Sequence, residues 1–429
     1  MTATDTHLAI DAVWRIESPK IIAVLTRMVR DIGIAEDLSQ DALVAALEQW
    51  PRTGRPDNPG AWLMAAAKHR AIDYFRRSQL LDRKHEELGR EVQAGKIFAS
   101  RLQMETLDAA FDDDIGDDLL RLLFIACHPV LSMEARAALT LRLLGGLTTD
   151  EIARAFLVPE PTIAQRIVRA KRTLSEKKVP FEVPRGEELT ARVSSVLAVI
   201  YLIFNEGYSA TAGGDWMRPA LCEDALRLGR TLAELAPREP EVHGLVALME
   251  IQASRSRART GPSGEPVLLL DQNRAHWDYI FIQRGFAAIE RAKRLGQSSG
   301  SYLLQAEIAA CHARAHAPED TDWNQIVSRY AELAQVTPSP IVELNRAVAV
   351  SMASGPAAGL AVVDTIVSDP ALKSYHLLPA VRGDLLFKLG RFQEAGEEFG
   401  RAALLTRNQR ERELLLARAA ECAASNLAQ

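Results

Sequence analysis

The sharpest pattern of apolar and polar positions lies in residues 147–174, LTTDEIARAFLVPEPTIAQRIVRAKRTL. It predicts two helices around a very short break. Thr148 and Glu151 fit a capping box at the first start, and prolines 159 and 161 end one helix and begin the next. The spacing predicts one buried face on each helix, made by Ile152, Ala153 and Phe156 on the first and Ile163, Ile167, Ala170 and Leu174 on the second. This pattern is typical of a helix-turn-helix.

The outward face of the second helix is basic. Residues 161–178 hold six cations and one acid, whereas the whole chain has a formal net charge of -5. Arginine and glutamine contact base edges, and further cations contact phosphates. We therefore predict DNA contacts from Thr162, Gln165, Arg166, Arg169, Lys171 and Arg172. The alternative is a solvated, charged helix face.

Two upstream segments are also predicted to be helical. Residues 58–77, NPGAWLMAAAKHRAIDYFRR, interleave aromatic and basic side chains, a mixture that suits opened DNA, although its aromatic groups also fit a core face. Residues 35–51, AEDLSQDALVAALEQWP, place acids in the first turns and a proline at the end, which also complements the helix dipole. An acidic spacer, FDDDIGDD, occupies residues 111–118.

The second half of the chain shows only helical periodicity, with proline and glycine breaks. Residues 386–402 fit the tetratricopeptide spacing, with expected packing positions at Leu389, Gly390, Phe392, Ala395, Phe399 and Ala402. A similar unit spans 345–363, where Gly355 precedes Gly390 by about one repeat period. Helix breaks are expected in 235–242 and 335–342. We predict an α-solenoid.

Two polar stretches interrupt this rhythm, YLIFNEGYSAT (201–211) and LLLDQNRAHWDYIFI (268–282). They contribute the candidate interdomain or regulatory residues Asn205, Glu206, Tyr208, Asp271, Arg274, Trp277 and Asp278. One hypothesis is that these groups bind a ligand or dock on the N-terminal half. The other hypothesis, which is slightly favoured, is that they form an internal network of hydrogen bonds and ion pairs that closes a helix junction.

Composition narrows the class of protein. No apolar run is long enough to span a membrane, and the expected location is the cytoplasm. Four scattered cysteines indicate neither a disulfide framework nor a zinc site. Cys311, His312 and His316 lack a second ligand pair, so we expect no metal. No phosphate loop or catalytic motif is present, and we expect neither a cofactor nor enzymatic activity.

The three N-terminal motifs together resemble an extracytoplasmic-function (ECF) sigma factor of the bacterial sigma-70 family over about residues 8–180. The resemblance implies an all-α fold with a region 2 domain (8–80), an acidic linker (81–117) and a region 4 helix-turn-helix domain (118–180). Pro161 stands where relatives often carry glycine.

The resemblance also implies partners and residue roles. Promoter DNA and core RNA polymerase, through its beta-prime clamp helices and beta flap, are the expected partners. The helix-turn-helix residues would contact the minus-thirty-five element. The implied polymerase contacts are Glu36, Asp37, Gln40, Asp41, Leu43 and Trp50. The implied minus-ten contacts are Trp62, Lys68, His69, Arg70, Asp73, Tyr74, Arg76 and Arg77.

With the helical second half, the chain resembles the ECF group that carries a tetratricopeptide-like (TPR-like) C-terminal extension (188–429), which is thought to control sigma activity in cis. A protein or small-molecule ligand of this extension is left open. The alternative function is a helix-turn-helix regulator or scaffold whose repeats bind a partner protein, without polymerase.

Overall fold

The computed structural model describes residues 3–88, 115–156, 158–184, 187–210, 212–213, 216–296 and 300–427, apart from some side chains within these ranges. Its contacts divide the chain into two units, Met1–Val199 and Ile200–Gln429, which are described separately. Among the described residues no helix is long and apolar enough to cross a bilayer. The expected all-α fold is confirmed for this part of the chain.

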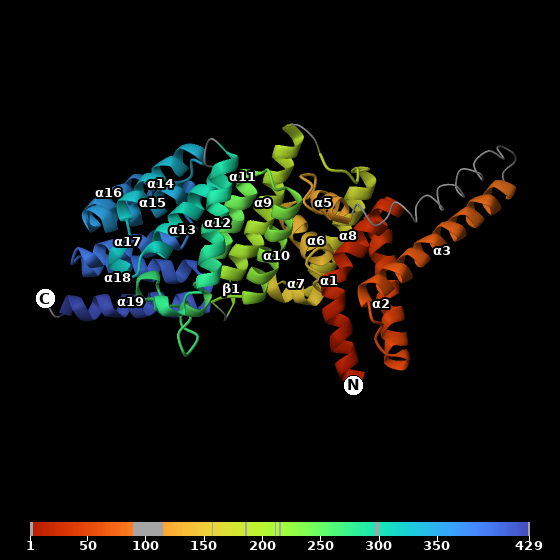
Figure 1. Cartoon of the computed structure of the whole chain (residues 1–429). Coiled ribbons are helices and arrows are strands. Elements are labelled where there is room, and N and C mark those ends of the chain that lie inside the picture. Colours follow the sequence, from red (N-terminus) through yellow and green to blue (C-terminus); the bar gives the residue numbers. More distant parts are fainter. Residues whose placement is uncertain are drawn as a thin grey trace. The chain divides into compact units, whose positions relative to one another are not determined.

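The N-terminal unit is a set of helices (Figure 1). They are α1 (Ala3–Val29), α2 (Ile32–Thr53), α3 (Pro59–Leu88), α5 (Ile115–Ala126), α6 (Met133–Leu143), α7 (Thr149–Phe156), α8 (Glu160–Glu176) and the first part of α9 (Glu187–Tyr208).

Helices α1, α2 and α3 share one apolar core. Ile21 and Leu25 of α1, Trp50 of α2 and Leu63 of α3 are almost fully buried in it. Local signals fix the start and end of α2. The Asp31 carboxylate accepts from the backbone N–H groups of residues 33 and 34, and Gly54, at a φ of 84°, ends the helix. This end of the unit is therefore a three-helix assembly with defined boundaries.

The predicted helix-turn-helix is confirmed in α7 and α8. The backbone N–H of Thr148 donates to Glu151 Oε2 at 2.8 Å, and the N–H of Glu151 donates to Thr148 Oγ1 at 3.2 Å, which is the predicted capping box. Pro159 is the N-cap of α8 and Pro161 lies in its first turn. The buried residues of α8 are the four that the spacing predicts, Ile163, Ile167, Ala170 and Leu174.

The C-terminal unit consists of helices, most of them joined by short turns, with a longer connection over residues 254–278 (Figure 1). After the end of α9 come α10 (Pro219–Leu235), α11 (Pro240–Ala253), α12 (Tyr279–Leu295), α13 (Ser301–Arg314), α14 (Trp323–Val336), α15 (Pro340–Ser354), α16 (Pro356–Ile366), α17 (Leu377–Lys388), α18 (Phe392–Leu405) and α19 (Gln409–Leu427). Single 3-10 turns are η1 (Ser256–Ala258), η2 (Leu269–Asp271), η3 (Arg274–His276), η4 (Pro318–Asp320) and η5 (Pro370–Leu372).

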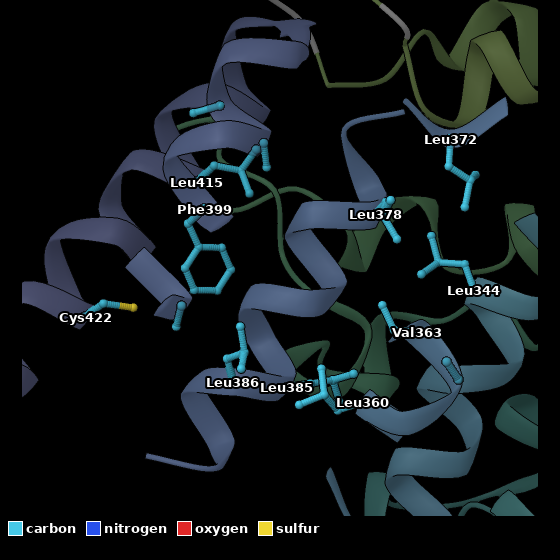
Figure 2. Packing of buried hydrophobic residues seen from close by; sticks show 14 residues of the cluster. Leu344, Leu360, Val363, Leu372, Leu378, Leu385, Leu386, Phe399, Leu415 and Cys422 are labelled. Atoms are coloured by element: carbon cyan, nitrogen blue, oxygen red, sulfur yellow. The ribbon is translucent and has the colours of Figure 1, made fainter. Parts of the chain in front are cut away.

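Two glycines of the predicted repeat units lie at helix-pair corners, and Ala395, Phe399 and Ala402 are buried as expected, whereas Leu389, expected to pack, is exposed at the end of its helix. Gly355 separates α15 from α16 at a φ of 93°, and Gly390 separates α17 from α18 at a φ of 75°, a region that favours glycine. The two expected breaks, 235–242 and 335–342, fall between α10 and α11 and between α14 and α15. Figure 2 shows the core of the last helices, where Phe399 of α18 lies among Leu386, Leu415 and Cys422.

Two short strands join the start and the end of the C-terminal unit. β1 (Ala212–Gly213) pairs in parallel with β2 (Arg407–Asn408), an element that the periodicity does not predict. Asn408 is fully buried, and its side-chain amide donates to the backbone carbonyl of Ala210 at 3.0 Å. The pairing therefore ties residues far apart in sequence.

The expected linker differs from the structure at both ends. Helix α3 continues to Leu88, and residues 115–117 already belong to α5. Asp118, the last residue of the acidic stretch, is buried and pairs with Arg27 at 3.2 Å and Arg121 at 2.7 Å. Residues 89–114 lie outside the described residues. The expected start of the extension at 188 lies within α9, whereas the boundary between the two units follows Val199.

Candidate nucleic-acid interface

Helix α8 exposes most of the residues predicted to contact DNA. Thr162, Gln165, Arg169 and Arg172 are exposed, opposite the buried apolar stripe, and Arg166 is half-buried. Arg172 Nε lies 2.6 Å from Glu176 Oε1, one turn further along. Because the stripe fixes the rotation of α8, the polar edge forms one continuous surface.

Helix α3 carries the predicted minus-ten residues. His69, Asp73, Arg76 and Arg77 are exposed, as is Tyr74, whereas Trp62, Lys68 and Arg70 are half-buried. Trp62 packs edge-on against Trp50, with ring centroids 5.4 Å apart. Arg70 lies 3.8 Å from Asp41, and Arg76 lies 3.6 Å from Asp73. The basic residues therefore share the middle of this helix with exposed aromatic and acidic groups.

The predicted polymerase contacts on α2 divide into surface and interior residues. Asp37 and Asp41 are exposed, and Gln40 and Leu43 are half-buried. Trp50 is 2% exposed and belongs to the core, and Glu36 is 3% exposed. In this conformation Trp50 packs and Glu36 forms buried ion pairs, so neither side chain is a surface contact. The sequence alone does not show whether an acidic or aromatic residue near a helix end is buried.

Glu36 lies between two cations from the helix-turn-helix part of the unit. Its Oε1 accepts from Arg142 Nε of α6 at 2.6 Å, and its Oε2 pairs with Lys171 Nζ of α8. Burial raises the pKa of Glu36, but Lys171 and Arg142 together lower it below the ordinary value. Lys171, which is predicted to contact DNA, therefore forms an ion pair with Glu36, which is predicted to contact the polymerase.

Further contacts join the two helix sets. Arg15 of α1 pairs with Glu151 of α7, and Ser175 Oγ of α8 donates to Asp31 Oδ2 at 3.1 Å. Sequence reasoning did not identify Arg142 or Arg15 as part of this surface. The sequence shows that the predicted helices carry charged residues, but it does not specify which of these residues form ion pairs with one another.

The polar stretches of the C-terminal unit form mainly internal contacts. Arg274 donates to the backbone carbonyls of His312 at 2.6 Å and Ala315 at 2.5 Å, and its guanidinium lies over the ring of Trp277, 4.9 Å from the centroid. Asp278 caps α12 by accepting from the N–H of Ile280 at 2.9 Å. These contacts hold in place the segment that precedes α12.

The first polar stretch has a similar arrangement. Glu206 is buried and ion-paired with Arg218. Tyr208 has the guanidinium of Arg259 3.4 Å from its ring centroid. Asn205 lines a cavity, whereas Asp271 is exposed. Tyr208 and Trp277 both lie near Arg255, each ring centroid 5.8 Å from its guanidinium, whereas Glu206 and Asp278 form separate contacts.

The structure offers no arrangement typical of a metal site among the residues it describes. Cys311 is buried and its Sγ lies 2.9 Å from Gln325 Oε1, and His312 packs edge-on against Trp323. The four cysteines are buried and free. Burial raises the pKa of Cys127 and of Cys222 to about 12, so these thiols stay protonated at neutral pH.

Comparisons with known proteins agree with the helical architecture. The model of Sigma-70 region 2 matches residues 14–80, that of Sigma-70, region 4 matches residues 121–174, and a family of unknown function (DUF6596) matches residues 192–293. No solved structure matches the chain. The two sigma matches cover the helices that carry the predicted DNA contacts, so the fold and the site define a sigma-70-type factor.

Full-length and partial relatives extend this result. The uncharacterized protein R00370 of Rhizobium meliloti is 42% identical over 92% of this chain and 91% of its own length. The probable ECF RNA polymerase sigma factor SigI of Mycobacterium tuberculosis is 24% identical over 41% of this chain and 58% of its own length. The ECF RNA polymerase sigma factor SigK of Mycobacterium ulcerans is 26% identical over 36% of this chain and 78% of its own. The chain belongs to the family of R00370, as an ECF-type sigma-70 factor with a long helical C-terminal unit.

Proposed function

We propose that this protein binds core RNA polymerase and directs it to promoter DNA. Helix α8 would contact the minus-thirty-five element and α3 the opened minus-ten element. The exposed acids of α2, Asp37 and Asp41, would contact the polymerase clamp. The observation that carries this proposal is the polar edge of α8, held outward by four buried apolar residues.

The surroundings of Arg166 and Arg172 in α8 suggest different roles. Arg166 is half-buried, so part of its side chain lies against the protein surface. Arg172 is exposed at the far end of the helix. A guanidinium that lies against the protein suits base recognition, whereas an exposed one suits phosphate.

We further propose that the C-terminal unit controls sigma activity in cis and is TPR-like. Its helix pairs and the recurrent glycine corners support a repeat architecture. Repeat stacks commonly present a surface for a ligand or a partner. The sign of the control follows from comparing the full chain with a chain that ends at Val199, where the first unit ends.

Run-off transcription with purified core RNA polymerase on genomic fragments tests the proposal. We expect promoter-specific transcripts from the full chain. Arg166→Ala should relax specificity at one base pair, a loss of about 1–3 kcal/mol for the preferred base, because a bidentate contact disappears. Arg238→Ala, which removes an exposed arginine of the C-terminal unit, is the matched control and should leave the transcripts unchanged.

Each outcome has a distinct meaning. If Arg166→Ala weakens all promoters equally, Arg166 contacts phosphate and the promoter proposal stands. If the chain neither binds core polymerase nor yields transcripts, the sigma proposal is wrong. Sequence-specific DNA binding without polymerase would instead identify a helix-turn-helix regulator.

A further inference from the structure

Four of the seven tyrosines in the chain line one cavity in the C-terminal unit. They are Tyr201 of α9, Tyr302 of α13, Tyr330 of α14 and Tyr375 near η5. The cavity has a volume of about 700 Å³. This is the size of sites that enclose small molecules, which are typically lined by aromatic groups with a few polar ones.

The cavity contains hydrogen-bonding groups that have no partner. Gln252 Oε1, Arg255 Nε and His312 Nδ1 are buried without a hydrogen bond among the described residues. A buried polar atom without a partner is destabilising unless a water or a ligand satisfies it, and three residues that line this cavity each have one such atom. Tyr201, in contrast, already donates to Gln305 Oε1 at 3.0 Å, which fixes one wall.

The charge in this cavity is positive and uncompensated. Arg255 is the single charged side chain among the described residues that line it, and no carboxylate lies within ion-pair distance of Arg255 in the described part of the chain. Its guanidinium lies 5.8 Å from the ring centroids of both Tyr208 and Trp277. These rings hold the guanidinium in place without neutralising it.

The surrounding groups are hydrogen-bond donors at neutral pH. Burial raises the pKa of Tyr330 to about 12 and raises the pKa of Tyr201, Tyr302 and Tyr375, so the phenols keep their protons. Burial, with Arg255 and Arg274 nearby, lowers the pKa of His312 to about 4, so the imidazole is neutral. The cavity therefore presents one cation and several neutral donors.

We propose that this cavity binds a small organic acid, with the carboxylate on Arg255 and an aromatic or other apolar body among the tyrosines. One arginine with neutral donors balances a monoanion, whereas a phosphate would bring a second charge without a partner. The site is distinct from the promoter surface and deepens the proposed control by the C-terminal unit. Its regulatory meaning rests on that proposal, but binding itself does not.

Fluorine NMR of the full chain labelled with 3-fluorotyrosine tests the site, with benzoate as probe and benzamide as its neutral analogue. We expect benzoate to shift the resonances of the four cavity tyrosines saturably, and benzamide to bind about tenfold more weakly. The resonances of Tyr74 and Tyr279, which do not line the cavity, should stay in place. Tyr→Phe variants assign each resonance.

Two arginine variants test the carboxylate contact. Arg255→Gln should weaken benzoate binding about tenfold, because a charge-assisted contact is lost, while the resonances of Tyr74 and Tyr279 stay in place as a sign of the native fold. Arg284→Gln, at an exposed position of α12, is the matched control and should bind benzoate as the native chain does. A short peptide with a free or an amidated C-terminus distinguishes a free acid from a peptide carboxylate.

Three results would overturn the assignment. They are equal binding of benzoate and benzamide, an unchanged benzoate affinity in Arg255→Gln, and no shift of any cavity tyrosine by benzoate. None of these results affects the promoter proposal, because the NMR experiment contains neither polymerase nor DNA. A failure of the transcription experiment, conversely, leaves the NMR result unchanged.

Discussion

At the scale of single residues, burial decides which titratable groups keep their ordinary chemistry. His312 is 8% exposed, and Arg255 and Arg274 add positive potential around it. In sequence it lies next to Cys311 in a stretch that resembles a metal motif only in residue types. Nothing local in the sequence shows that tyrosines from four segments converge beside this histidine.

The lowered pKa of His312 predicts a loss of stability at mildly acidic pH. The imidazole titrates at 6.5 when unperturbed and at about 4 in the folded chain. Between these values the unfolded chain binds a proton that the folded chain does not, so the stability present above pH 6.5 is lost as the pH falls. From pH 7.5 to pH 5 the native chain should lose about 2 kcal/mol relative to His312→Gln.

Urea unfolding at several pH values measures this difference. His316→Gln, at an exposed position of the same segment, is the control and should keep the native pH profile. Parallel profiles for the native chain and His312→Gln would show that His312 does not titrate in this window.

At the scale of elements, sequence periodicity predicts helix faces well and helix partners poorly. The four buried residues of α8 and the capping box of α7 follow from local spacing, because an amphipathic helix must bury its apolar stripe. The pairing of Glu36 in α2 with Arg142 and Lys171 does not follow, because it depends on how helices far apart in sequence pack. Asp118 was likewise expected in a spacer and is buried in α5.

The buried position of Glu36 predicts a large effect of a nearly isosteric change. Glu36→Gln removes the charge that neutralises Arg142 and Lys171, and should destabilise the N-terminal unit by about 3 kcal/mol. Glu48→Gln, on an exposed turn of the same helix, should change stability by less than about 0.5 kcal/mol. Urea unfolding followed by tryptophan fluorescence measures both variants. Equal stabilities would mean that the ion pairs are not maintained in solution.

At the scale of the whole molecule, the division into two units falls inside a helix. The sequence predicts a start of the second domain at 188, after a proline-containing break, yet α9 runs from Glu187 to Tyr208 and residues up to Val199 belong to the first unit. Arg192 Nη2 donates to the carbonyl of Phe124 at 2.8 Å, and Ser195 Oγ donates to that of Cys127 at 2.7 Å. The prolines before residue 188 indicate where helicity is interrupted, but hydrogen bonds such as those of Arg192 and Ser195 decide which residues belong to the first unit.

These contacts predict that truncation at the apparent linker is harmful. A chain ending at 184 should be about 2–3 kcal/mol less stable than one ending at Val199, because hydrogen bonds to the carbonyls of Phe124 and Cys127 are lost. Calorimetry of the two chains measures the difference as several degrees in Tm. Ser195→Ala in the full chain is a milder test of the same contact. Equal Tm values for the two truncated chains would contradict this view of α9.

The single carboxylate of Glu36 has one more consequence for a sigma factor. It closes ion pairs with both α6 and α8, so separating α2 from these helices uncovers one anion and two cations in the same event. The three side chains are released together, so the Glu36 anion becomes available to a basic partner only when the Arg142 and Lys171 cations become available to an anion. A partner that satisfies just one of them must leave the other charge unpaired, which favours simultaneous loading over stepwise loading.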